Sequence, residues 1–229
     1  MVDFITAIKK PFTDLKALGI GTVLSCIPII SLFVSGYALK VAEDTMGKKN
    51  KLRAWALNDA VDYLVKAILS MIIGLAYMII PIVLIVAGVG GALASALMTP
   101  GGFDVSQLGQ TLMNALIVGA PLILAGALLM IIALIMLPMA MMKWIKSGSI
   151  MSAFNVIAVI KNVLTVDYIL SLIVLFVYAI VFSIVIGIIS MIAGFIPIVG
   201  FLVIMLLNGL MSFAMMITVY TTIAQTVKN

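Results

Sequence analysis

Long uncharged stretches dominate this sequence and limit what it can fold into. Four of them occur, over residues 17–39, 67–98, 105–142 and 168–227. A helix needs roughly 20 consecutive apolar residues to cross the hydrocarbon core of a bilayer, and each stretch is at least that long. In the whole chain 65% of residues are hydrophobic and 9% are charged, whereas soluble domains average about 45–50% apolar and about 25% charged residues. We therefore predict an all-α, polytopic membrane protein.

The basic residues can all be placed on one side of a membrane. All 13 Lys and Arg residues precede, separate or follow the stretches, within segments 9–16, 40–66 and 143–161 and at residue 228. No Lys or Arg occurs in residues 99–104 or beside Pro197. Because cytoplasmic loops collect Lys and Arg, this asymmetry predicts a multi-pass protein of the cell membrane with a cytoplasmic N-terminus and C-terminus.

The last stretch, 168–227, is too long for one crossing and contains a turn signal at Pro197, with a glycine nearby on either side. Proline interrupts a helix, and glycine permits a tight reversal. We predict one crossing over 168–193 and a return over 195–224. The two middle stretches supply one crossing each, so the prediction is four full transmembrane helices.

The first stretch, 17–39, allows two interpretations because Pro28 lies near its middle. A hairpin bent at Pro28 has arms of roughly 20 Å, which are too short to cross, whereas one straight helix reaches roughly 34 Å. The hairpin keeps Lys9, Lys10 and Lys16 on the same side as the other basic residues. We favour this Pro-centred re-entrant hairpin, and a continuous helix, which makes five spans, is the alternative.

Short amphipathic segments precede the stretches on the basic side and indicate a pseudo-threefold repeat. Segments 3–10 and 153–161 align a Phe and a Lys, and segment 58–66 matches them in pattern only. Such a segment lies as a cytoplasmic interfacial helix in the headgroup plane, or else it is the wet end of a transmembrane helix. We predict one membrane-embedded domain over 1–229, which consists of 1–52, 53–142 and 143–229.

The residue types that catalysis most often uses are scarce. The chain has no His, a single Cys, and eight acidic residues that all lie in predicted loops or at predicted helix ends. Histidine is the usual proton shuttle and the commonest metal ligand, and ion-coupled transporters usually carry a charged group within the membrane. The sequence shows no nucleophile–base pair and no glycine-rich phosphate loop. We therefore expect no enzymatic activity, no cofactor, no metal site and no nucleic-acid partner.

Some residues within the apolar stretches stand out as packing or ligand contacts. They are Pro28, Gly88, Gly91, Asn114, Pro197 and Asn208. The glycines belong to small-residue faces that let helix backbones approach closely in lipid, and the asparagines are amides that seek a hydrogen-bond partner there. The two prolines are expected to interrupt their helices, and interrupted helices form the substrate sites of many transporters.

Several short motifs together resemble one family. They are Ile27-Pro28-Ile29-Ile30 followed by GYALKV at 36–41, Leu52-Arg53-Ala54-Trp55, Ala153-Phe154-Asn155, and Ile196-Pro197-Ile198-Val199-Gly200. As a set they resemble a largely archaeal family of uncharacterised integral membrane proteins, domain of unknown function 4013, over nearly the whole chain. The family usually has Leu-Pro-Glu-Trp at the second motif. The resemblance implies a membrane fold and an archaeal origin, and it supplies no catalytic or binding residue.

These features favour a non-enzymatic membrane protein with a structural, assembly or scaffolding role. Its expected partners are membrane lipid, a second copy of the chain or another membrane protein. The alternative is an uncoupled channel or carrier for a small or apolar solute, which predicts a cavity near Pro28, Asn114 or Asn208.

Overall fold

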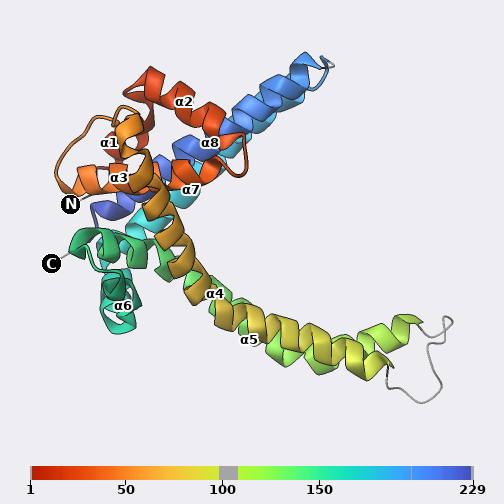
Figure 1. Cartoon of the computed structure of the whole chain (residues 1–229). Coiled ribbons are helices and arrows are strands. Elements are labelled where there is room, and N and C mark those ends of the chain that lie inside the picture. The colour runs from red at the N-terminus through yellow and green to blue at the C-terminus, as the bar shows by residue number, and fades with distance from the viewer. Residues whose placement is uncertain (1, 98–107, 197, 228–229) are drawn as a thin grey trace. The chain divides into compact units, whose positions relative to one another are not determined.

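The structure, a computed structural model, describes residues 2–97, 108–196 and 198–227 (Figure 1). These residues form helices and no strand, which confirms the predicted all-α class. Four of the described helical segments are long and apolar enough to cross a membrane, as predicted. They cover Leu57–Ala94, Ile117–Ser147, Val166–Ala193 and Val199–Ala224.

The chain divides into two compact units. The first comprises Met1–Ile73 and Pro138–Asn229, and the second comprises Gly74–Leu137. Helices α4 (Ala60–Leu97) and α5 (Leu108–Ser147) each contribute residues to both units. The predicted single domain over 1–229 stays a prediction.

The first unit is built around its last helix. Helix α8 (Val199–Ala224) contacts α2 (Leu15–Ser25), α3 (Ser31–Met46) and α7 (Val166–Ala193). Figure 1 shows α8, in blue, beside the red and orange helices of the N-terminal region. The first apolar stretch thus packs against the last one.

Two glycines allow α2 and α8 to approach closely. A Cβ at Gly21 would overlap the ring of Phe213, and a Cβ at Gly209 would overlap Cys26 Sγ and the carbonyl oxygen of Thr22. In lipid, close packing of this kind drives helix association, because lipid tails are as apolar as leucine. The contact therefore depends on residues without side chains.

A break at Pro28 separates α2 from α3. Helix α2 ends at Ser25 and α3 begins at Ser31, and the exposed Pro28 lies in the turn, where its carbonyl accepts a hydrogen bond of 2.6 Å from Ser31 Oγ. No described helix runs the length of 17–39, so the continuous helix is not observed. The re-entrant placement of the two arms in a membrane stays a prediction.

Two of the three predicted amphipathic segments form separate short helices. These are α1 (Phe4–Lys9), followed by η1 (Lys10–Phe12), and α6 (Val156–Val163), preceded by η4 (Ile150–Phe154). Side-chain oxygens cap their first turns. Asp3 accepts from the Thr6 N–H, and Asn155 accepts from the Ala158 N–H.

The third segment, 58–66, forms no separate helix. Its first residues make η2 (Leu57–Asp59), which leads directly into α4. No Gly or Pro separates Asp59 from the apolar stretch, so nothing stops the helix there. This segment is therefore continuous with a helix that is long enough to span a membrane, and the threefold repeat stays a prediction.

In the second unit, α4 and α5 lie side by side (Figure 1). Gly88 faces the carbonyl of Gly119, and Gly126 faces the carbonyl of Pro81, so the two backbones approach closely. Gly91 has no described atom outside its own helix turn within 4 Å of the position that a Cβ would take. Of the two glycines singled out from the sequence, Gly88 thus packs against α5, whereas Gly91 has no such contact among the described residues.

Candidate functional site

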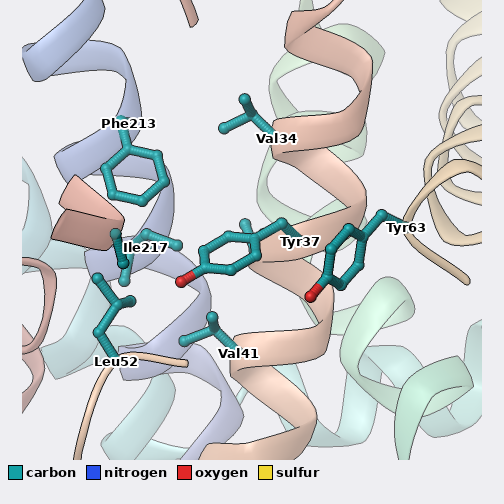
Figure 2. Packing of buried hydrophobic residues seen from close by; sticks show 9 residues of the cluster. Val34, Tyr37, Val41, Leu52, Tyr63, Phe213 and Ile217 are labelled. Atoms are coloured by element: carbon teal, nitrogen blue, oxygen red, sulfur yellow. The ribbon is translucent and has the colours of Figure 1, made fainter. Parts of the chain in front are cut away.

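Four aromatic side chains, Tyr37, Trp55, Tyr63 and Phe213, are called here the aromatic cluster and join three helices and a loop in the first unit. Figure 2 shows Tyr37, Tyr63 and Phe213. Tyr37 of α3 stacks on Trp55 with 3.9 Å between ring centroids and 8° between ring planes. Tyr63 of α4 meets Tyr37 edge-on at 5.6 Å, and Phe213 of α8 lies 5.9 Å away. Such pairs contribute about 0.5–1.5 kcal/mol each beyond the burial of area. Figure 2 shows Tyr37 between the α8 residues and Tyr63.

The polar atoms of this cluster bind backbone. The Tyr37 O–H donates to the carbonyl of Arg53, and Trp55 Nε1–H donates to the carbonyl of Ala17 at 3.0 Å. Both bonds hold the loop that follows α3 against the N-terminal helices.

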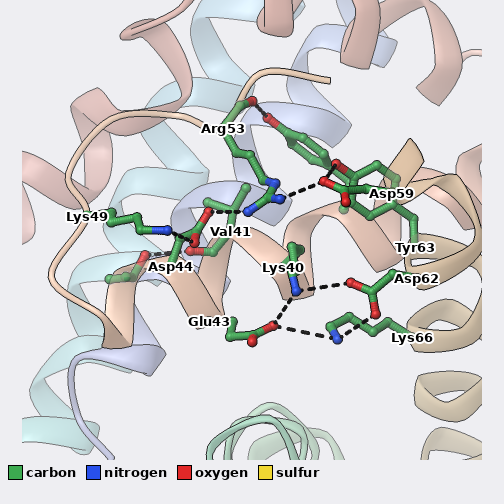
Figure 3. Close-up of polar contacts among 12 residues, drawn as sticks. Lys40, Val41, Glu43, Asp44, Lys49, Arg53, Asp59, Asp62, Tyr63 and Lys66 are labelled. Carbon is green, nitrogen blue, oxygen red and sulfur yellow. Dashed lines mark hydrogen bonds and ion pairs between the residues drawn. The ribbon is translucent and has the colours of Figure 1, made fainter. Parts of the chain in front are cut away.

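Beside the aromatic cluster lies a group of paired charges, called here the ion-pair network (Figure 3). Its members are Lys40, Glu43, Asp44, Lys49, Arg53, Asp59, Asp62 and Lys66. Arg53 joins two carboxylates, because its guanidinium donates to Asp44 at 3.2 Å and to Asp59 at 2.6 Å. Asp44 also accepts from Lys49 at 2.9 Å. The loop is therefore tied to the end of α3 and to the start of α4.

The other half of the ion-pair network links α3 directly to α4. Lys40 lies 3.2 Å from Glu43 and 3.1 Å from Asp62. Lys66 lies 3.0 Å from Asp62 and 3.6 Å from Glu43. Asp59, Asp62 and Lys66, which lie within eight residues of one another, all belong to the network.

Protonation in the ion-pair network follows its geometry. Burial of Asp44 disfavours its charged form, but hydrogen bonds from Lys49 and Arg53 outweigh this and lower the pKa of the carboxyl. The hydrogen bond to Asp59 raises the pKa of Arg53 above its ordinary range. Asp44 and Arg53 thus stay charged at neutral pH. The network has four basic and four acidic members. Chemically, the network positions a loop.

Two grooves flank the contact between α2 and α8. The first, called the Asn208 groove, has a volume of ≈ 440 Å³ and is lined by Ser25, Cys26 and Phe201 as well as Asn208. The second, called the leucine groove, has a volume of ≈ 400 Å³ and is lined mainly by leucine and valine side chains of both helices. Both grooves lie along apolar helix faces.

The structure places the predicted site residues as follows. Asn208 is exposed and lines its groove, and its Nδ2–H donates to the carbonyl of Ile204 at 2.9 Å, within the same helix. Pro28 lies in the turn after α2 and does not line that groove. Pro197 and the side chain of Asn114 lie outside the described residues. A ligand role for any of these residues stays a prediction.

The aromatic cluster was missed from the sequence. Its members come from positions 37, 55, 63 and 213, and each is an ordinary residue of its own segment. Tyr37 and Trp55 do belong to the motifs that carry the family resemblance. That shared membership is the only signal in the sequence that pointed toward them.

Comparison with known proteins identifies one relationship. A family model described as Protein of unknown function (DUF4013) matches residues 20–191. The matched range contains the motifs around Pro28, Arg53 and Phe154, and it ends before the motif around Pro197. No curated protein and no solved structure matches the chain.

Proposed function

This chain belongs to the family described as Protein of unknown function (DUF4013), and on the basis of its fold we propose that it is a non-enzymatic integral membrane protein that acts through lateral contacts. Its partners in these contacts are membrane lipid, a second copy of the chain or another membrane protein. The observation that carries the proposal is the large apolar surface of its long helices. In the most apolar segment of α7, only 11% of the residues are buried within the chain, and in that of α8, 28% are buried.

Helix α7 supports the proposal most directly. Its residues Phe176, Ile184 and Ile192 are 67%, 56% and 61% exposed. A helix that is apolar on all sides is stable only when lipid or protein surrounds it. Since α7 contacts α6 and α8 and leaves these side chains bare, the missing cover is lipid or another protein surface.

The leucine groove favours lipid as part of that cover. It is open along α2 and α8 and is lined by apolar side chains such as Leu18, Leu206 and Leu210. A groove of ≈ 400 Å³ with such a lining suits an acyl chain better than a polar solute. The Asn208 groove is what favours the alternative, an uncoupled carrier, but the Asn208 amide already bonds within its own helix.

Contacts at the basic end of the first unit support the proposed orientation, in which both termini are cytoplasmic. The Asp3 N–H donates to Gln225 Oε1 at 2.7 Å, so the N-terminal segment meets the end of α8. Lys146 Nζ donates to the carbonyl of Val227 at 3.3 Å, so the end of α5 lies there as well. Segments that we place in the cytoplasm therefore meet in space.

Native mass spectrometry of the chain, extracted in mild detergent and also placed in lipid nanodiscs, tests the proposal. We expect an oligomer, a co-purifying membrane protein or retained lipid. The control is the same sample after exchange into a delipidating detergent. This exchange should release the bound lipid, and binding should return when lipid is added back. A monomer without lipid or partner in both mild conditions would contradict lateral contacts as the function.

A further inference from the structure

A small polar pocket, called here the Lys10 pocket, lies in the first unit where the N-terminal segment, the end of α3 and the end of α8 meet. Its volume is ≈ 170 Å³. Its lining includes Asp3, Lys10, Thr45, Lys48, Asn50 and Thr221. None of these residues belongs to the aromatic cluster or the ion-pair network, so the pocket is a separate feature.

Lys10 is a buried cation. The residue is 1% exposed, and its Nζ donates to Thr45 Oγ1 at 2.6 Å and to the carbonyl of Lys49 at 2.8 Å. Among the described residues it forms no ion pair with a carboxylate. An ammonium has three N–H donors, and these two bonds leave one for the pocket. Since a buried charge with no carboxylate at ion-pair distance is costly, an anion in the pocket would stabilise it.

Thr221 supplies a second, independent indication of a ligand. The residue is 1% exposed, and its Oγ1 is buried without a hydrogen-bond partner among the described residues. Buried polar groups nearly always have a partner, so each exception requires an explanation. Because Thr221 lines the pocket that holds Lys10, a ligand with acceptor atoms would satisfy both groups.

The remaining lining favours an anion. Lys48 is exposed at the pocket, and its backbone φ of 62° places it in the left-handed region. Among the described lining residues, Asp3 is the only acidic one, and its carboxylate already accepts from the Thr6 N–H at 3.0 Å and from Thr6 Oγ1 at 2.5 Å. Asn50 adds a neutral amide donor. The balance of two lysines against one engaged carboxylate is positive.

We propose that the Lys10 pocket binds a phosphate group, as a free phosphate or as the phosphate ester of a lipid headgroup. Its donors come from three separate segments, η1, the loop after α3, and α8. A tetrahedral phosphate offers oxygens in several directions and accepts strong hydrogen bonds from lysine. The site goes beyond the proposed lateral contacts, because a phosphate bound in this polar pocket needs neither an oligomer nor the apolar faces of the long helices.

The ionisation of Lys10 agrees with this site. Burial lowers the pKa of Lys10 from 10.5 to about 8, although Asp44 nearby acts in the opposite direction. The ammonium is therefore mostly protonated at neutral pH. The charged groups that face the pocket besides Lys10 are Asp3 and Lys48. Phosphate affinity should accordingly fall as the pH rises above about 8.

The test is a titration of the full chain in neutral detergent with inorganic phosphate at constant ionic strength. Its readouts are the melting temperature and the broadening of the phosphorus NMR line. We expect phosphate to raise the melting temperature, and Lys10→Met and Thr221→Val each to raise the half-saturating concentration about tenfold or more, which corresponds to about 1.4 kcal/mol. Thr221→Val should melt no lower than the wild type without phosphate, because it removes an unpaired hydroxyl and keeps the shape.

Two control variants match these changes. Thr218→Val alters another buried threonine of α8 that does not line the pocket. Lys51→Gln removes an exposed charge from the loop after α3, which also contains Lys48. Both should bind phosphate as the wild type does, whereas Lys48→Gln should weaken binding about threefold.

A second arm separates the two sources of phosphate. The wild type and Thr221→Val are compared in nanodiscs of phosphatidylglycerol and in nanodiscs of a phosphate-free galactolipid. Stabilisation by inorganic phosphate identifies a soluble ligand, and stabilisation by phosphatidylglycerol alone identifies a headgroup; either must be lost in Thr221→Val. If neither phosphate nor phosphatidylglycerol stabilises the wild type, or if the control variants lose the effect equally, the site is refuted.

Discussion

At the scale of single residues, the polar side chains act near the ends of the long helices. Arg53 binds Asp44 and Asp59 with its side chain and accepts from the Tyr37 O–H with its carbonyl. One residue thus connects the ion-pair network to the aromatic cluster. An uncharged side chain at position 53 could make neither ion pair.

Because Lys10 is buried, we expect the free energy of unfolding to depend on pH in a characteristic way. Burial lowers its pKa from 10.5 to about 8, so between these values the unfolded chain binds more protons than the folded chain. The free energy of unfolding should therefore rise with pH across this window, by about 1 kcal/mol per pH unit. Lys10→Met should abolish that rise.

Thermal unfolding of both proteins in phosphate-free detergent solution, from neutral pH to pH 10, measures this difference. Lys40 is the relevant confounding group. Its burial acts against the charged form, but bonds to Asp62 and Glu43 outweigh this and raise its pKa, so it adds stability that is lost only at still higher pH. Parallel pH profiles for the wild type and Lys10→Met would show that Lys10 is not desolvated.

At the scale of helices, glycines determine which backbones meet. Gly36 of α3 lies against the backbone carbonyl of Tyr63, and Gly21 of α2 lies against the ring of Phe213. Gly19, two residues before Gly21, has no described atom outside its own helix turn within 4 Å of its would-be Cβ. The same residue type therefore has a packing role at some positions and none at others.

This contrast predicts opposite effects of the same substitution. Gly36→Ala should destabilise the chain by about 1–3 kcal/mol or more, because its methyl group meets a backbone atom that cannot rotate away. Gly19→Ala should stabilise α2 by about 0.5–1 kcal/mol, because alanine loses less conformational freedom in a helix. Melting temperatures in detergent measure both changes. Equal effects would mean that α3 and α4 do not approach as described.

At the scale of the whole molecule, the membrane topology of the region of α2 and α3 has two alternatives. The positions of the basic residues favour a cytoplasmic N-terminus. The contacts of the two terminal segments place them close together. If the arms of α2 and α3 form a re-entrant hairpin, Lys9 and Lys51 lie on the same side. If that region crosses the membrane, they lie on opposite sides.

Cysteine labelling in a Cys26→Ala background distinguishes these cases. We expect Lys9→Cys and Lys51→Cys to resist a membrane-impermeant maleimide in sealed cells and to react after the membrane is opened. Gly101→Cys, in the connection that we predict to be external, should react in both conditions. Labelling of position 9 in sealed cells while position 51 stays protected would rule out the hairpin.

The sequence predicts the spanning helices well and the rest of the first unit poorly. For the last two crossings we predict 168–193 and 195–224, and the structure has Val166–Ala193 and Val199–Ala224. An uncharged stretch in lipid must satisfy its backbone internally, and a helix does so within one segment. For segment 58–66 the sequence leaves two interpretations open, because amphipathic patterns look alike in interfacial helices and at the ends of spanning helices. The structure shows that the segment continues into α4.

By itself, the sequence determined the helical class, the long apolar helices and the family, because these depend on local composition and on short motifs. Only the tertiary structure brought Tyr37, Trp55 and Tyr63 together, and only it placed Lys10 and Thr221 at one pocket. These residues lie far apart along the chain and share no local pattern. Which of them meet depends on the close approach that glycines permit between helices, and that approach exists only in three dimensions.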